Sequence, residues 1–192
     1  MVEARTTGSN LIGQIGPNLE ANLPKYIRTT PEERSREMQA AAFGEKTEQV
    51  SKFEYVELIE TVRAIRPWLK ENGRTASDHP DFVNTPGHEI YWISDAADLN
   101  SPYISFEPRP WEQQSGKNLE AYPKFTVEAI VAGNEVQFEL NFDDTYYLSI
   151  GKSDGTIRFV SSHLSRREMT KQEYVIVKTT ISQATAHYTI PI

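Results

Sequence analysis

The stretch from Phe125 to Val160 constrains the fold more than any other part of the chain, because its apolar residues recur at every second position. Alternation with period two is the pattern of a β-strand that buries one face. It occurs here in four consecutive runs, which begin at Phe125, Val136, Tyr146 and Ile157. We therefore predict four antiparallel strands that each pair with the next one along the chain.

Short polar segments between these runs predict the turns and thereby the register. Gly133-Asn134 indicates a two-residue type II′ turn, because glycine tolerates the positive φ that its first position needs. The segments 143–145 and 151–154 predict the next two loops. The rows predicted on one face are Phe125, Phe142, Tyr146 and Phe159, and next to it Val127, Leu140, Leu148 and Ile157. All of these residues are apolar or aromatic, so this face is expected to be buried.

The opposite face of the predicted meander is polar and holds four candidate binding residues. In the predicted register Arg158 faces Tyr147, which suits a cation–π contact, and Glu128 faces Glu139, which is a like-charge pair. We interpret this face as a site for a cation or a basic partner, or as a carboxylate pair for acid–base chemistry. The alternative is an ordinary solvated face, which antiparallel sheets commonly have.

Two helices are predicted before the meander. Thr30 and Pro31 mark the start of the first, and Gly44 marks its end. The second is strongly amphipathic, runs from about Thr47 to Lys70 and is expected to cover the buried face of the sheet. Pro67 lacks a backbone donor, so we expect a kink or an end near residue 66.

The remaining segments complete an α+β fold. Residues 89–93 and 103–106 predict two short strands at edge positions, because prolines flank both. Residues 165–168 have capping-box spacing, and residues 174–190 are predicted to form a last hairpin. We expect an antiparallel meander sheet of about six to eight strands, packed by one long amphipathic helix with one or two short helices. An irregular N-terminal arm, residues 1–29, precedes a single domain over residues 30–192.

The segment Pro108-Arg109-Pro110-Trp111 is the most conspicuous predicted loop. It is stiff, cationic and aromatic, and such a loop loses little entropy when it binds a partner. We therefore add Arg109 and Trp111 to the candidate binding residues. The alternative is that Trp111 packs over one end of the sheet.

Composition narrows the classes of function. The chain has no cysteine, so thiol nucleophiles, disulfides and cysteine metal sites are excluded. The sequence contains no phosphate-binding loop, dinucleotide fingerprint, nucleophile elbow or zinc-protease motif. His79 and His88 lie near acidic residues but without a metal-ligand spacing. We therefore predict no catalytic, cofactor or metal residues and lean towards a protein that is not an enzyme.

Charge and hydropathy bear on location and partners. The 192 residues carry a formal net charge of −7, which argues against nucleic acid as a general partner. No apolar run is long enough to span a membrane, so no membrane partner is expected. Together with the absence of cysteine, this favours a cytoplasmic location.

Four segments resemble the N-terminal lobe of ribosome-inactivating protein A chains in order and approximate spacing, over about residues 53–160. They are Tyr55-Val-Glu-Leu-Ile-Glu-Thr-Val-Arg63, His88-Glu-Ile-Tyr-Trp92, Tyr103-Ile-Ser-Phe106 and Asp143-Asp-Thr-Tyr-Tyr-Leu-Ser-Ile-Gly-Lys-Ser-Asp-Gly-Thr156. The resemblance implies that Tyr146 takes the place of the family's adenine-stacking tyrosine in an rRNA N-glycosidase pocket. The family's catalytic Glu-x-x-Arg helix, and the tryptophan after it, are absent from this sequence.

Three hypotheses of function follow. The first is a non-catalytic intracellular module that binds another protein, of the viral accessory, immunity or assembly type. The second is a small-ligand-binding or enzymatic domain that uses the concave face of a curled sheet. The third is a fragment that acts on rRNA, as the resemblance implies. The sequence leaves the identity of the partner and the oligomeric state open.

Overall fold

The computed structural model describes residues 31–44, 48–79, 89–94, 101–109, 123–141, 145–152, 157–165 and 168–190. Within these ranges the chain forms three α-helices, one short 3-10 helix and seven strands. The helices are α2 (Pro31–Phe43), α3 (Lys52–Asn72), η1 (Ala76–Asp78) and α4 (Lys171–Thr185). The strands are β1 (Arg74–Thr75), β2 (Glu89–Ile93), β3 (Tyr103–Arg109), β4 (Lys124–Val131), β5 (Asn134–Asn141), β6 (Thr145–Gly151) and β7 (Ile157–Ser165).

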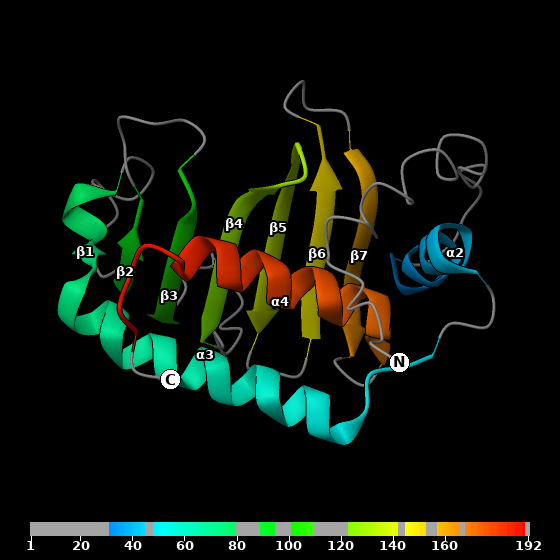
Figure 1. Ribbon diagram of the computed structural model, residues 1–192, viewed down its shortest axis with the longest axis horizontal. Helices are drawn as coiled ribbons and strands as arrows, with labels where there is room; N and C mark the ends of the chain where they lie inside the picture. Colours follow the sequence, from blue (N-terminus) through cyan, green and yellow to red (C-terminus); the bar gives the residue numbers. More distant parts are fainter. Residues whose placement is uncertain are drawn as a thin grey trace, which may run out of the picture.

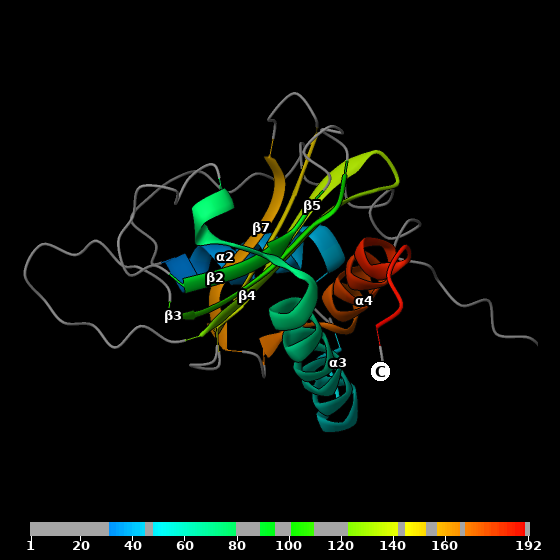
Figure 2. The same ribbon diagram turned by 90° about the vertical axis from the view of Figure 1, so that its left-hand side faces the viewer.

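All seven strands form one antiparallel sheet in which the spatial order is the sequence order, from β1 to β7. Figure 1 shows α4 crossing the strands and α3 running along one end of the sheet, with α2 beyond β7. Figure 2 shows that α3 and α4 lie on the same side of the sheet. This confirms the predicted α+β meander. The predicted edge positions of β2 and β3 are wrong, because β1 pairs with β2 and β3 lies between β2 and β4.

The β4–β5 hairpin turns one residue earlier than predicted. Ala132 and Gly133 form the turn with φ values of 51° and 74°, and positive φ at both central residues is the type I′ conformation. The predicted type II′ turn is therefore wrong, and Val127 pairs with Phe138 instead of Leu140. The error in register is two residues. Because side chains alternate with period two, an even shift leaves each on its predicted face.

The two following hairpins differ from prediction in the same way. Leu148 pairs with Phe138 on one side and with Ser161 on the other, where Leu140 and Ile157 were predicted. In the β6–β7 hairpin Gly151 already pairs with Ile157, so the turn lies further along the chain than predicted, and a bulge between Ile150 and Gly151 adds one more residue to the shift. The predicted apolar face is nevertheless the buried one, since Leu140 and Leu148 have no exposed surface.

Helix α3 supplies the long cover that the sequence predicts. Ser51 caps its start in a capping box with Glu54, so the helix begins later than the predicted Thr47. It passes through Pro67 and ends at Asn72, before Gly73, so of the kink or end predicted near residue 66 the end is excluded. Leu69 is fully buried beyond the proline, and this packing holds the last turn in place. The buried stripe consists of Leu58, Ile59, Val62, Ile65 and Leu69.

Residues 171–185 form a helix, so the hairpin predicted over residues 174–190 is wrong. Thr170 caps α4 in a capping box with Glu173, five residues beyond the capping box predicted from Ser165. The helix is rich in β-branched residues, which favour strands in isolation. Tyr174, Ile181 and other apolar residues at helical spacing are buried against the sheet, and this tertiary contact overrides the local preference.

Polar contacts fix α2 at the β7 end of the sheet. The helix ends before Gly44, as predicted, where φ is +91°. The Gln39 amide donates hydrogen bonds to the Tyr146 hydroxyl (3.1 Å) and to Glu173 Oε2 (2.9 Å). Arg36 donates to Glu168 Oε1 at 2.6 Å. The predicted short helix is thus confirmed, and a buried amide ties it to the core.

Candidate functional site

The sheet face opposite α3 and α4, which we call the outer face, holds three of the six predicted binding residues. Side chains on β3 to β6 form three rows across it, defined by the register of the strands. The rows are Tyr103, Glu128, Gln137 and Ser149; Ser105, Thr126, Glu139 and Tyr147; and Glu107, Lys124 and Asn141. These three rows of the outer face are therefore mainly polar.

Three of the four residues predicted on this face come together. Glu139 pairs with Tyr147, while Glu128 pairs with Gln137 and lies diagonal to Glu139, so the predicted direct carboxylate pair is wrong. The backbone of Arg158 does not pair with that of Tyr147. Tyr147 pairs with Ser162, and Arg158 lies four residues before Ser162, at a bulge, so the predicted pairing is wrong.

The proline-rich segment is described only up to its second residue. Arg109 is the last residue of β3, and its backbone pairs with Glu89. Trp111 lies outside the described residues, so its part in a binding loop stays a prediction.

One lysine, Lys124, lies near two carboxylates on the outer face. Lys124 Nζ lies 3.4 Å from Glu107 Oε1 and 3.9 Å from Glu139 Oε2. The second distance is too long for a strong ion pair, and Glu139 Oε1 also accepts a hydrogen bond of 3.0 Å from Gln137. Among the described side chains of β3 to β6 on this face, Lys124 is outnumbered by Glu107, Glu128, Glu135 and Glu139.

The excess of negative charge affects the pKa of Glu128. The crowding of protein atoms around its carboxyl, followed by repulsion from Glu139 and Glu135, raises the pKa of Glu128. Much of the side chain still reaches solvent, so the effect on stability is small. Among the described residues, the carboxylates of Glu139 and Glu135 thus add to the cost of ionising Glu128.

Two buried residues with hydroxyl side chains lie beside these carboxylates. Ser105 is 1% exposed and Thr126 is 5% exposed, and they pair directly across β3 and β4. The outer face is therefore closely packed at this pair, while Glu128 in the neighbouring row is exposed.

His79 belongs to an aromatic cluster at the β2 side of this face. Its Nε2 lies 3.1 Å from the Tyr103 hydroxyl, and its ring meets Trp92 edge-on with centroids 4.9 Å apart. Trp92 in turn donates to the Thr75 carbonyl at 3.1 Å. Over the ranges that are described, no three His, Cys, Asp or Glu residues are grouped to hold a metal ion. His79 therefore packs the sheet, and His88 lies outside the described residues.

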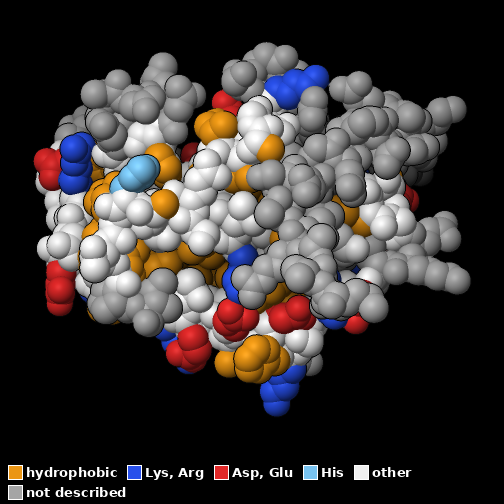
Figure 3. All heavy atoms as spheres, in the orientation of Figure 1, with side chains coloured by type: hydrophobic (Ala, Val, Ile, Leu, Met, Phe, Trp, Pro, Cys, Tyr) orange, Lys and Arg blue, Asp and Glu red, His pale blue; other side chains and the backbone are white. Residues whose placement is uncertain are grey.

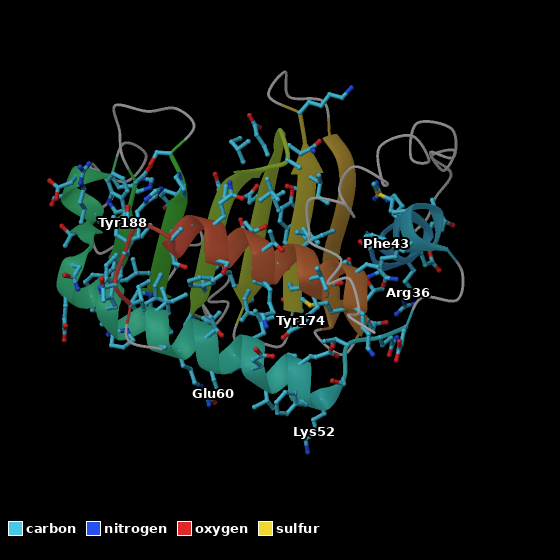
Figure 4. All side chains as sticks on the ribbon, in the orientation of Figure 1. Arg36, Phe43, Lys52, Glu60, Tyr174 and Tyr188 are labelled. Atoms are coloured by element: carbon cyan, nitrogen blue, oxygen red, sulfur yellow. The ribbon has the colours of Figure 1, made fainter. Side chains whose placement is uncertain are left out.

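A second surface, which we did not predict from the sequence, lies at the start of α3. Phe53 and Val56 are 78% and 45% exposed, and they are one helical turn apart. We call these two residues the α3 patch. Figure 3 shows hydrophobic side chains projecting over the start of α3 among charged groups. Lys52 and Glu60, labelled in Figure 4, lie to either side of the patch along the helix and point away from the sheet.

Ion pairs occupy the carboxylates around the α3 patch. Glu57 Oε1 lies 2.7 Å from Lys178 Nζ, and Glu60 Oε1 lies 2.6 Å from Arg63. The hydrogen bond from Lys178, followed by the one from the Tyr174 hydroxyl, lowers the pKa of Glu57. Glu57 and Glu60 are therefore paired with basic residues of this chain. The patch between them is apolar.

The sequence did contain a signal for the α3 patch. Phe53 and Val56 are apolar but fall out of phase with the stripe that includes Leu58 and Val62, so a regular helix turns them away from the core. Apolar residues on the wrong face of an amphipathic helix mark a candidate contact surface.

Tyr146, singled out by the resemblance, lies on the helix-covered face. It is 1% exposed, and its hydroxyl donates a 2.9 Å hydrogen bond to Glu173. None of the described helices is both long and apolar enough to cross a membrane. Comparisons of the chain with protein-family models, with curated proteins and with solved structures find no match.

Proposed function

We propose that this chain is a non-catalytic protein-binding module and that the α3 patch contacts its partner. The observation that carries the proposal is the exposure of Phe53 (78%) and Val56 (45%) on a helix whose opposite face is completely used in the core. The patch plays no part in the packing of the described fold. Burying the patch against another protein would remove its apolar surface from water and so favour association.

The free energy available at the patch is sufficient for a specific anchor. Full burial of one phenylalanine or valine side chain contributes about 1.5–3 kcal/mol. Both residues stand on a regular helix with a capping box at its start, so their backbone is already ordered before binding. Anchors that are ordered in advance lose less entropy on association.

The proposal includes the location expected from composition. A chain without cysteine suits a reducing compartment, so we propose a cytoplasmic partner. The outer face, with its surplus of carboxylates, is a second surface through which such a partner, if basic, gains electrostatic attraction.

Site-specific photo-crosslinking tests the proposal. A photoreactive phenylalanine analogue replaces Phe53 in one variant and Glu71 in the control, because Glu71 is exposed on the same helix away from the patch. In cells that express the chain, we expect one discrete adduct from position 53 and none from position 71. Adding Val56→Asp to the first variant should abolish this adduct. Equal patterns from positions 53 and 71, or no adduct at 53, contradict the proposal.

A further inference from the structure

A separate inference concerns α2 and does not depend on the α3 patch. Among residues 33–43, whose burial is described, the two buried side chains of this helix are polar: Ser35 is 2% exposed and Gln39 is 7% exposed. The apolar side chains that pack against the core, Met38, Ala42 and Phe43, are only partly buried. The hydrophobic effect therefore contributes less to the docking of α2 than to that of α3 and α4, which bury apolar stripes.

Polar contacts around Gln39 hold α2 against β6 and the start of α4. The Gln39 amide donates to the Glu173 carboxylate at 2.9 Å and to the Tyr146 hydroxyl at 3.1 Å. Arg36 forms an ion pair with Glu168, but the two side chains are 58% and 30% exposed, and an ion pair in contact with water stabilises little. The docking of α2 thus depends strongly on one buried amide.

The core of the sheet is complete without α2. Its cluster of buried apolar side chains comes from α3, α4, strands β3 to β6 and Met169, and it includes no residue from the described part of α2. The capping box of α4 is also independent of this helix, because Thr170 donates its backbone N–H to Glu173 Oε2 at 2.8 Å. Figure 1 shows α2 apart from the two helices that cover the sheet. Departure of α2 therefore leaves the remaining fold supported.

The chain on the C-terminal side of α2 allows such a departure. Gly44 follows the helix directly with a φ of +91°, and a side chain at this position would meet open space. Glycine adopts this conformation and others at little cost, so the backbone can turn here. The chain is fixed again soon afterwards, because Lys171 donates its N–H to the Glu48 carbonyl (2.9 Å) and Val50 to the Met169 carbonyl (2.8 Å).

We propose that α2 is a lid that docks reversibly over the polar groups of Tyr146 and Glu173, and that Gln39 is the contact that closes it. Elements with few buried apolar contacts open locally while the rest of a protein stays folded. In the closed state Tyr146 is 1% exposed and Glu173 has no exposed surface. Opening of the lid makes a carboxylate and a hydroxyl accessible that the closed fold buries.

Native-state hydrogen exchange of the full chain, followed by NMR at neutral pH, tests the lid. We expect the amides of residues 35–43 in α2 to exchange at least about 100-fold faster than those of residues 176–181 in α4, because α2 opens without global unfolding. Equal protection of the two helices means that they open together, and this result overturns the proposal.

Matched variants show whether Gln39 closes the lid. Gln39→Glu replaces a donor to Glu173 by a second carboxylate, and Glu37→Gln makes the reverse exchange at an exposed position of the same helix. Glutamate and glutamine have similar helix propensities, so neither change acts on the helix itself. Exchange in α2 should become about tenfold faster in Gln39→Glu, as expected for a lost hydrogen bond to a charged group, and less than about twofold faster in Glu37→Gln.

Two outcomes of this comparison overturn the proposal. Equal effects of the two variants mean that Gln39 does not hold the helix. A parallel loss of protection in α4, or failure of Gln39→Glu to fold, means that α2 is part of the cooperative core.

A covalent link tests whether docking is reversible. The sequence has no cysteine, so Arg36→Cys combined with Glu168→Cys introduces two unique thiols at positions that are in contact when the lid is closed. Linking the thiols with a bismaleimide should slow exchange in residues 35–43 by about tenfold or more, relative to the same variant capped with N-ethylmaleimide. Failure of the link to form, or equal exchange in the linked and capped chains, contradicts the lid.

Discussion

The two faces of the sheet consist of alternate residues of the same strands, yet their polar side chains lie in different surroundings. On the helix-covered face, the Tyr146 hydroxyl and the Glu173 carboxylate are buried together, and Thr170 and Gln39 also donate to Glu173 Oε2. On the outer face, the carboxylate of Glu128 is exposed and that of Glu139 has only the distant ion pair with Lys124, at 3.9 Å. The difference shows that charged groups are held in a buried hydrogen-bonded cluster on one face and near solvent on the other.

The largest expected difference between the faces is at neighbouring positions of β5. Phe138 has no exposed surface and lies at the centre of the core, so Phe138→Ala should lower the free energy of unfolding by about 3–5 kcal/mol. Gln137 faces the other way, and Gln137→Ala should cost less than about 1 kcal/mol. Urea unfolding followed by circular dichroism measures both. Similar costs at the two positions contradict the assignment of the faces.

A smaller effect is expected from the hydroxyls of two neighbouring tyrosines on β6. Tyr146→Phe removes a donor from buried Glu173 and should lower the free energy of unfolding by about 1–3 kcal/mol. Tyr147→Phe acts on the half-exposed outer face and should change it by less than about 0.5 kcal/mol. The same unfolding experiment compares the two variants. A larger cost at Tyr147 means that the outer face is as tightly hydrogen-bonded as the core.

The smallest effect concerns charge and is expected to stabilise. The pKa of Glu128 is raised above its ordinary value of 4.5, so the native state loses stability when this group ionises. Glu128→Gln should therefore raise the free energy of unfolding at neutral pH, by a few tenths of a kcal/mol after solvent screening. The gain should disappear as the pH falls below about 4.5, where the wild-type carboxyl is protonated in both states. A variant that is less stable at neutral pH shows that Glu128 makes a favourable contact instead.

The assignment of residues to the two faces could be predicted from the sequence, because it depends only on the alternation of side chains along each strand. Every predicted pairing in the meander was displaced by an even number of residues or by bulges, and the apolar set still faced the helices. The exact pairing depended on Ala132, which adopts a positive φ that favours glycine or asparagine over alanine. Local chemistry therefore favoured the wrong turn while the hydrophobic pattern remained correct.

Other features depended on contacts between distant segments and were not accessible from local patterns. The β-branched run that ends at Ile181 favours a strand until the sheet offers a surface for a helix to cover. Likewise, nothing in the sequence around Ser105 and Thr126 shows that these two residues are buried. The predicted site residues Glu128, Glu139 and Tyr147 were found from alternation alone, while Arg158 was misplaced because the turn between β6 and β7 lies further along the chain than predicted.

The sequential strand order has a consequence for synthesis of the chain on the ribosome. Each strand pairs with its neighbour in sequence, so hairpins can form as soon as they emerge, and such local pairing is fast. Two long helices cover the sheet: α3 precedes β1 in the sequence, and α4 follows β7. The apolar face therefore stays half open until residue 185 has been made, and during that interval the nascent chain is at its greatest risk of aggregation.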